Sequence, residues 1–352
     1  MLASLLVGLM LAQTQAATPA PDGNPMALSP EIQAFLDQKV DRGLADKERL
    51  EALVQAVFQD ESLKFTYAPE TRTAIETFTN RGGNCLSFTI LFIAIARHVG
   101  LDARFREVEI APAWSKNGMF VSLNKHVNAA VFIGGMGYAI DVFPGVNRIE
   151  LGGQIVPDAR GLAHFYNNIG ADELGKGNLA VAEAYLRKAL EMDPKAVSVW
   201  INLGVTKGQA GELREAESCY RKALQLDSRE LVAMSNLAGL CQRTGRSREA
   251  LRYMTKVKEF QEKNPYHHYN LGLQAFEAGN YQVSIAEYKK ALKLKSKEHN
   301  FYFALARAYA KLDQLEDAMT SLQLASKYAP DSSNQNRYNQ KLELLKASQN
   351  PS

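Results

Sequence analysis

The chain has 352 residues, of which 46% are hydrophobic and 22% charged, with 24 glycines and 12 prolines. This ordinary globular composition excludes a disordered, collagen-like or low-complexity protein, and the length suffices for about two domains. Basic residues (41) barely outnumber acidic ones (38), so the net charge of +3 does not favour nucleic acid as a partner. The three cysteines are too few for a disulfide scaffold and lack the spacing of a zinc site.

The N-terminal segment predicts export. An apolar run within residues 1–17 is followed by small and polar residues, and it is too short for a bilayer, which needs roughly 20 residues. We expect a signal peptide cleaved near Ala16 or Ala17, hence a periplasmic or secreted protein, although the first basic residue is only Lys39. The alternative is a buried N-terminal helix in a cytoplasmic protein. Residues 18–28 are predicted to be a linker, and no later segment is a candidate membrane span.

The first half of the chain continues with helical periodicity over residues 30–64, in two pieces broken near Gly43. A second, almost uniformly apolar helix is predicted from Cys85 to Gly100, with Asn84 as its N-cap. Cys85 then lies in the first helical turn, where unsatisfied N–H groups and the helix dipole favour a thiolate. A glycine pair just before Asn84 allows a substrate to approach the sulfur closely.

After this helix the periodicity changes to two, which predicts strands over residues 103–110, 126–133 and 138–143, with a turn at 134–137. His126 opens the second of these strands and Asp141 lies in the third. The two residues are a few positions out of register, but side chains on a twisted hairpin can still be neighbours.

A cysteine at a helix start, then a histidine and an aspartate on successive strands, resembles the transglutaminase-like superfamily of the papain-type α+β fold. The resemblance covers residues 65–145, within a predicted domain of 29–160. It implies acyl transfer through a thioester, with Cys85 as nucleophile, His126 as general base and Asp141 orienting the imidazole. The backbone N–H of Cys85 is a candidate oxyanion donor. Water or an amine could accept the acyl group, and no cofactor or metal is implied.

The second half of the chain repeats every 34 residues. Small residues mark the repeat at Gly170, Gly204, Ala238, Gly272 and Ala306. This period resembles the tetratricopeptide repeat in five units over residues 163–330, which implies an all-α solenoid with a concave groove. Glu173 and Lys207 replace a tyrosine of the family, and so predict looser packing. Residues 331–352 are expected to form a capping helix and tail, with Tyr338, Leu342, Leu344 and Leu345 facing inward.

Four aromatic residues fall at concave positions of these repeats: Tyr266, Tyr269, Phe276 and Phe303. They could anchor a protein or peptide partner, or they could pack on the other domain or on the capping helix. Cys219 and Cys241 are interpreted as buried structural thiols, with a disulfide between them left open.

The combined hypothesis is an exported cysteine acyl-transfer enzyme whose repeats bind a protein. Its alternative is a non-catalytic scaffold in which both domains only bind. The sequence leaves substrate and oligomeric state open.

Overall fold

The structure is a computed structural model that describes residues 23–59, 63–110, 116–117, 120–121, 126–140 and 150–349. Contacts divide it into two compact units. Unit 1 comprises residues 1–106, 127–144 and 155–219, and unit 2 comprises residues 107–126, 145–154 and 220–352. The predicted signal peptide and Asp141 lie outside the described residues. Within the described part of the chain, no helix is both long and apolar enough to cross a membrane.

Unit 1 begins with two helices, as predicted. α1 (Pro30–Lys39) is capped by the Ser29 side chain, and α2 (Asp46–Val54) continues into a π-helical turn at Gln55–Gln59. The short helix α3 (Ala74–Asn80) is followed by strand β2 (Gly82–Gly83), which pairs in parallel with β1 (Thr66–Tyr67).

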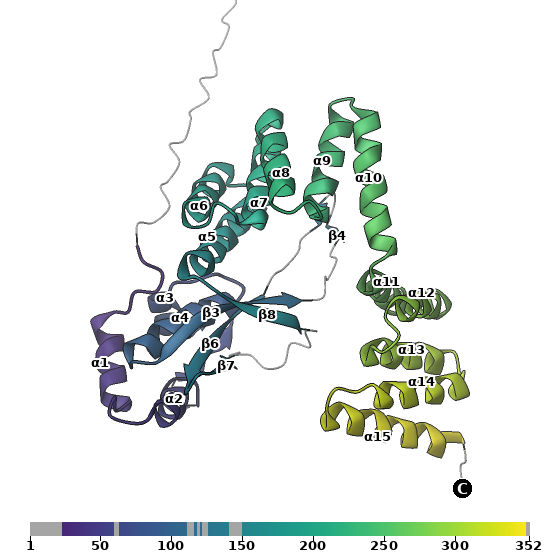
Figure 1. The fold of residues 1–352 in the computed structure, drawn as a ribbon, viewed down its shortest axis with the longest axis horizontal. Helices are drawn as coiled ribbons and strands as arrows, with labels where there is room; N and C mark the ends of the chain where they lie inside the picture. The colour runs from purple at the N-terminus through teal and green to yellow at the C-terminus, as the bar shows by residue number, and fades with distance from the viewer. Residues whose placement is uncertain are drawn as a thin grey trace, which may run out of the picture. The chain divides into compact units, whose positions relative to one another are not determined.

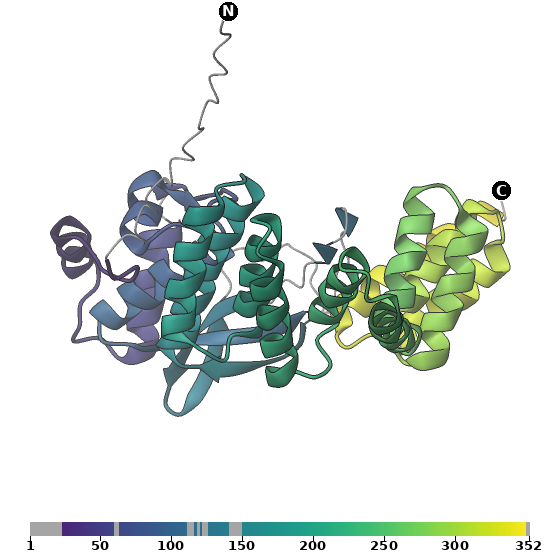
Figure 2. The same ribbon diagram turned by 90° about the horizontal axis from the view of Figure 1, so that it is seen from above.

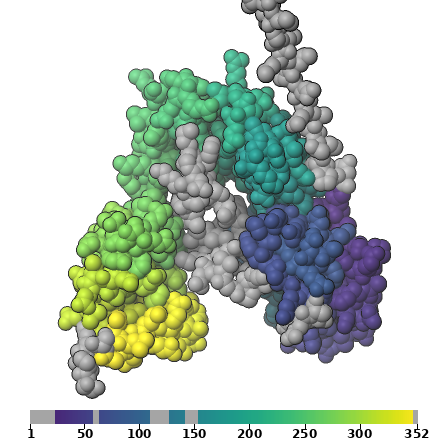
Figure 3. Space-filling model, turned by 180° about the vertical axis from the view of Figure 1, so that it is seen from behind, coloured from purple at the N-terminus to yellow at the C-terminus, as the bar shows by residue number. Residues whose placement is uncertain are grey.

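Helix α4 (Cys85–His98) is the central element of unit 1. All its residues from Leu86 to Ala96 are buried, and the helix ends at Val99, followed by Gly100 with a φ of 85°. The predicted buried helix is therefore confirmed. α4 contacts both α1 and α3, and the purple and blue segments lie against one another in Figures 1 and 3.

A four-stranded sheet lies beside α4, with the strand order β7-β6-β3-β8. Its strands are β3 (Asp102–Ile110), β6 (His126–Ile133), β7 (Met136–Ile140) and β8 (Glu150–Val156). The β6–β7 turn consists of Gly134 and Gly135, since Ile133 already pairs with Met136. Both glycines have positive φ angles, as a two-residue hairpin turn requires. The predicted four-residue turn is wrong. β8 was not predicted, since its Gly-Gly pair interrupts any alternation.

The first repeat helices complete the core of unit 1. α5 (Asp158–Gly175), α6 (Leu179–Met192) and α7 (Val197–Gln209) pack together in Figure 2, and α8 (Leu213–Leu226) follows them. One hydrophobic cluster extends without a break from Ile32 through α4 and the sheet to Leu203 and Cys219. The core of the α+β part and that of the first repeats are therefore the same core.

Unit 2 holds the remaining repeat helices and the small hairpin of β4 (Lys116–Asn117) and β5 (Phe120–Val121), which contacts α9. The helices are α9 (Leu231–Arg243), α10 (Ser247–Glu262), α11 (Pro265–Glu277), α12 (Tyr281–Leu294), α13 (His299–Lys311), α14 (Leu315–Lys327) and α15 (Ser332–Gln349).

Helix α15 caps the solenoid, with one correction to the expected inward face. Tyr338 and Leu342 are buried and Leu345 is partly buried, but Leu344 is 70% exposed. The inward residues are spaced i, i+4 and i+7, which is one stripe of a helix, and Leu344 lies one residue off that stripe.

Candidate active site at the start of helix α4

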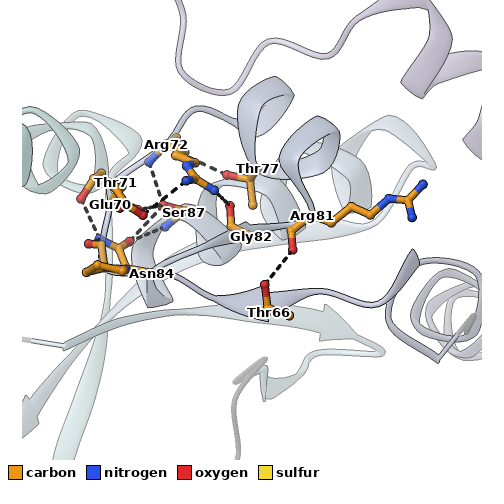
Figure 4. Close-up of polar contacts among 10 residues, drawn as sticks. Thr66, Glu70, Thr71, Arg72, Thr77, Arg81, Gly82, Asn84 and Ser87 are labelled. Carbon is orange, nitrogen blue, oxygen red and sulfur yellow. Dashed lines mark hydrogen bonds and ion pairs between the residues drawn. The ribbon is translucent and has the colours of Figure 1, made fainter. Parts of the chain in front are cut away.

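The start of α4 is held by Asn84, which acts as its N-cap (Figure 4). The Asn84 Oδ1 accepts hydrogen bonds from the Ser87 backbone N–H and the Ser87 hydroxyl, both at 3.0 Å. Its Nδ2 donates to the Thr71 Oγ1 at 2.7 Å and to the Pro69 carbonyl at 3.2 Å. The predicted cap is confirmed, and its amide also ties the helix start to the preceding loop.

Ser87 joins the same loop from inside the helix. Its side chain is fully buried and accepts a hydrogen bond from the Arg72 backbone N–H at 2.8 Å. The Arg72 guanidinium donates to the Gly82 carbonyl at 2.9 Å (Figure 4). We call Asn84, Ser87 and residues 69–72 the Asn84 centre. Its bonds to the helix are made by neutral groups.

Gly83 has a structural reason to be glycine. A Cβ atom at this position would lie 2.6 Å from the Ser87 Cβ, well inside contact distance. The residue before the N-cap therefore passes directly against the buried Ser87 side chain, and any larger residue would displace the helix start.

Cys85 is the first residue of α4 and is half-buried. One turn later, the Thr89 hydroxyl lies 2.8 Å from the Cys85 carbonyl and 3.1 Å from the Val127 carbonyl, and it can donate to either. Val127 directly follows His126, the first residue of β6. A contact within one helical turn of Cys85 thus fixes α4 to β6 beside the candidate histidine.

The structure describes the three predicted catalytic residues to different extents. Cys85 is described fully, and His126 opens β6 as predicted, although its side chain lies outside the described part. Asp141 lies outside the described residues altogether. On β6 the buried Asn128 accepts a hydrogen bond from the Arg106 guanidinium at 3.4 Å.

Sequence reasoning missed Ser87 and Thr89 as parts of this site. Both are buried polar residues within the apolar run of α4, and that exception to the pattern is a usable signal. The partners in residues 69–72 could not be found in the same way, because no local pattern connects that loop to the helix.

Charges of both signs lie around the start of α4. The first turn of α4 has no acidic residue, so nothing in it offsets the positive end of the helix dipole. Glu70 is paired with Arg72 at 3.3 Å. In α5, burial raises the pKa of the Asp172 carboxyl, and the nearby carboxylates of Glu173 and Glu70 raise it further.

The other two cysteines are buried in the repeats, as predicted. Burial raises the pKa of the Cys219 thiol to about 11, and Cys241 is fully buried. All three cysteines are present as thiols, so Cys219 and Cys241 are not paired. Among the residues that the structure describes, no cluster of histidine, cysteine and acidic side chains could hold a metal ion.

A second polar centre, built around one buried lysine, lies among α6, α7 and the start of α8. The Lys207 ammonium, 8% exposed, contacts the carboxylates of Glu212 at 2.7 Å, Glu183 at 2.9 Å and Glu215 at 3.1 Å. We call these four residues the Lys207 centre. Instead of the looser packing predicted here, Lys207 holds three acidic side chains together.

The four predicted groove aromatics divide into two pairs. Tyr266 and Tyr269 pack against Phe301, with ring centroids 5.4 and 4.8 Å apart, and belong to the core. Phe276 and Phe303 are half-buried, and each lies under an arginine. Arg307 is 4.7 Å from the Phe276 ring centroid and Arg337 is 4.8 Å from that of Phe303. Phe303 also contacts Tyr338 of the capping helix, at 5.1 Å.

Family comparisons agree with this architecture. Residues 33–140 match the transglutaminase-like superfamily, and residues 163–196, 195–263 and 275–340 match tetratricopeptide repeats. The chain therefore contains a transglutaminase-like domain followed by tetratricopeptide repeats, which confirms the predicted α+β domain with an all-α solenoid. No curated protein matches the chain.

Three solved structures illustrate the segments that are similar to this chain. The crystal structure of MamA is 22% identical, covers 47% of this chain and 91% of its own, and gives a TM-score of 0.27. YrrB, described as a TPR protein with an unusual peptide-binding site, is 19% identical. It covers 51% of this chain and 92% of its own, and gives a TM-score of 0.27. PilF of Pseudomonas aeruginosa is 22% identical, covers 55% of this chain and 88% of its own, and gives a TM-score of 0.29.

Proposed function

We propose that the transglutaminase-like domain is a cysteine acyl-transfer enzyme with Cys85 as its nucleophile. The observation that carries this proposal is the capped start of α4, where a half-buried thiol occupies the first turn and Thr89 fixes the helix beside the first residues of β6. A helix start favours a thiolate, and a fixed start gives the sulfur one position.

The proposed reaction begins when the Cys85 sulfur attacks the carbonyl carbon of an amide. His126 takes the thiol proton and passes it to the departing amine as the carbon–nitrogen bond breaks, which leaves a thioester on Cys85. Water or a second amine then attacks the thioester and gives up a proton to His126. The acyl product departs and the thiol is restored. The backbone N–H of Cys85 is proposed to stabilise the oxyanion.

Asp141 is proposed to orient His126, and the hairpin register supports this role. The described pairs run from Ile133↔Met136 to Ala129↔Ile140. His126 thus opens a strand whose described partner, β7, ends at Ile140, the residue before Asp141 in the sequence.

The direct test compares the protein with its Cys85→Ala variant in the native host or a host extract, by mass spectrometry of new peptide termini and new amine cross-links. Cys241→Ala, which removes a buried thiol, is the matched control. We expect cleavage or cross-linking products that vanish only in Cys85→Ala. Identical products from all three proteins would contradict the enzyme and support the binding scaffold.

For the repeats, we propose a protein partner that presents an acidic, extended segment. Exposed cations and half-buried rings alternate on α11, α13 and α15, where Arg337 and Lys341 both lie over Phe303 and Arg307 lies over Phe276. Guanidinium groups above rings bind carboxylates while the rings offer apolar contact. In the sequence, Arg337 follows Phe303 by 34 residues, so the capping helix continues the repeat register.

Fluorescence anisotropy with a labelled peptide of alternating Glu and Phe tests this surface. We expect binding that weakens at least tenfold in the double variant Arg307→Glu with Arg337→Glu, and no binding of the matching Lys–Phe peptide. Equal binding of both peptides would overturn the charge assignment.

Export to the periplasm or medium is proposed from residues 1–17. Sequencing the N-terminus of the native protein tests it. A mature start near Ala17 or Thr18 is expected, and an intact Met1 would contradict export.

A further inference from the structure

Strand β7 (Met136–Ile140) is the outer strand of the four-stranded sheet and pairs only with β6 among the described strands. Met136 is 63% exposed and Tyr138 is 42% exposed. Natural proteins protect exposed sheet edges with charged residues, prolines or bulges. None of the five residues of β7 is charged or a proline, and the described β6–β7 pairs run without a bulge. Among the residues that the structure describes, no other strand pairs with this edge, so it can accept one.

The hairpin geometry determines which backbone groups face outward. In a hairpin with a two-residue turn, the pair that flanks the turn exchanges both of its hydrogen bonds, and alternate pairs then do the same. Ile133↔Met136 flanks the turn, so Met136, Tyr138 and Ile140 bond to β6. Gly137 and Ala139 direct their N–H and C=O groups to the open edge.

We propose that β7 pairs antiparallel with β7 of a second copy of this chain, about a two-fold axis through Tyr138. This register opposes Gly137 of one copy to Ala139 of the other, and Tyr138 to Tyr138. Both outward residues of each copy then exchange N–H···O=C bonds with the second copy, which makes four hydrogen bonds that join two four-stranded sheets into one. The dimer is independent of the catalytic proposal, because it needs neither Cys85 nor the repeats.

The side chains fit a second copy of the same strand. Residues 136, 138 and 140 share one face, so the two copies place Tyr138 beside Tyr138 and Met136 beside Ile140, as aromatic and aliphatic cross-strand pairs. On the opposite face Ala139 of one copy meets Gly137 of the other, which has no side chain and lies against the Phe132 ring of its own copy. Because β7 is uncharged, self-pairing brings no like charges together.

The test is the mass of the full-length protein by light scattering over a concentration series up to about 1 mM. An interface of one short strand is small, so we expect a dissociation constant on the order of 100 μM. Tyr138→Lys should return the protein to a monomer, because it places two like charges directly opposite each other. Ile155→Lys is the matched control, since Ile155 is 41% exposed on β8 at the other edge of the sheet.

Two further measurements keep the proposal falsifiable. An equimolar mixture of Tyr138→Lys and Tyr138→Glu should dimerise although each variant alone is monomeric, because opposite charges then meet at the axis. Ala139→Pro should also give a monomer with an unchanged circular dichroism spectrum, since it removes only an outward N–H. A monomer at all concentrations, or a dimer that Ile155→Lys disrupts and Tyr138→Lys does not, would overturn the proposal.

Discussion

Unit 1 contains two polar centres, one around the buried Ser87 and one around the buried Lys207, which both fix helices in place but use different physical means. The Asn84 centre holds the start of α4 with hydrogen bonds from amide, hydroxyl and backbone groups. The Lys207 centre holds α6, α7 and the start of α8 with one cation among three carboxylates. Neutral hydrogen bonds depend little on pH, whereas an ion cluster depends on every one of its members staying ionised.

The difference shows why each centre suits its place. A carboxylate as the cap of α4 would also satisfy the helix N–H groups, but it would put a negative charge beside Cys85 and disfavour the thiolate. Asn84 caps without that charge. In the Lys207 centre, burial of a cation is acceptable because three acidic partners surround it.

The largest expected effect is the difference in thiol reactivity that this neutral cap permits. We expect brief exposure to iodoacetamide at pH 7.5 to label Cys85 at least about 100-fold faster than Cys219 or Cys241, because the pKa of Cys219 is raised to about 11 and Cys241 is fully buried. Mass mapping of the labelled peptides measures the three rates. Equal or slower labelling of Cys85 would count against an activated nucleophile.

The next effect concerns the Lys207 centre. Lys207→Met removes the buried cation from Glu183, which keeps Arg187 as a partner, and from the more exposed Glu212 and Glu215, so we expect a loss of about 2–3 kcal/mol in the free energy of unfolding at pH 7. Urea unfolding followed by circular dichroism measures it. Lys176→Met, which removes an exposed lysine paired with Glu173, is the control and should change little.

The pH dependence of that loss identifies its cause. Burial alone would raise the pKa of Glu183, but hydrogen bonds from Lys207 and Arg187 outweigh it and leave the pKa below its ordinary value. For Lys207 the three carboxylates outweigh burial and raise its pKa. The ionic contribution is therefore present between about pH 5 and pH 10, and disappears as acid protonates the glutamate or base deprotonates the lysine. A loss in Lys207→Met that is the same at pH 3 and pH 7 would indicate packing instead.

A smaller effect is expected from Gly83→Ala, which tests the close approach of Gly83 to Ser87 of the Asn84 centre. The added Cβ would lie 2.6 Å from the Ser87 Cβ, so we expect a destabilisation of about 1–3 kcal/mol and slower labelling of Cys85. Gly175→Ala is the control, because a Cβ there meets open space at the end of α5. If both variants keep wild-type stability and labelling, the contact at Gly83 does not position the helix.

The smallest effect is the loss of the cap itself. Asn84→Ala should cost about 1 kcal/mol of stability, with little change between pH 5 and pH 8, because the group is neutral. Thr73→Ala removes the cap of α3, which carries a reciprocal capping box, and should cost a similar amount. Only Asn84→Ala should slow the labelling of Cys85. If Cys85 is labelled at the same rate in Asn84→Ala and Thr73→Ala, the Asn84 cap does not affect the reactivity of the thiol.

The elements that the sequence predicted correctly are those with a local signal. Asn84 and the apolar run to Gly100 predict the helix from neighbouring residues alone. The 34-residue period predicts the repeats because the same pattern recurs along the sequence. The four turn glycines at 177, 211, 245 and 279 all have positive φ, and even Asp313, which replaces a fifth, has a φ of 57°. Such positions can be predicted from sequence because a positive φ angle at the end of a helix favours glycine and a few short polar residues.

The parts that sequence reasoning missed depend on distant contacts. Lys207 was predicted to loosen the packing, because the glutamates that surround it come from α6, from the α7–α8 turn and from the first turn of α8. Strand β8 was missed because pairing with β3 compensates for its poor local propensity. Thr89 could be recognised only as a polar residue in an apolar helix, and its partner on β6 follows from the fold alone.

The shared core of unit 1 has a consequence for synthesis of the chain. The cluster that begins at Ile32 is completed only by Leu203 and Cys219, far beyond the last strand of the sheet. While a ribosome is still making the repeats, α4 and the sheet therefore expose apolar surface that the first repeats will later cover. A fragment that stops near residue 160 should bind chaperones or aggregate, whereas one that continues to residue 219 should acquire its full hydrophobic interior.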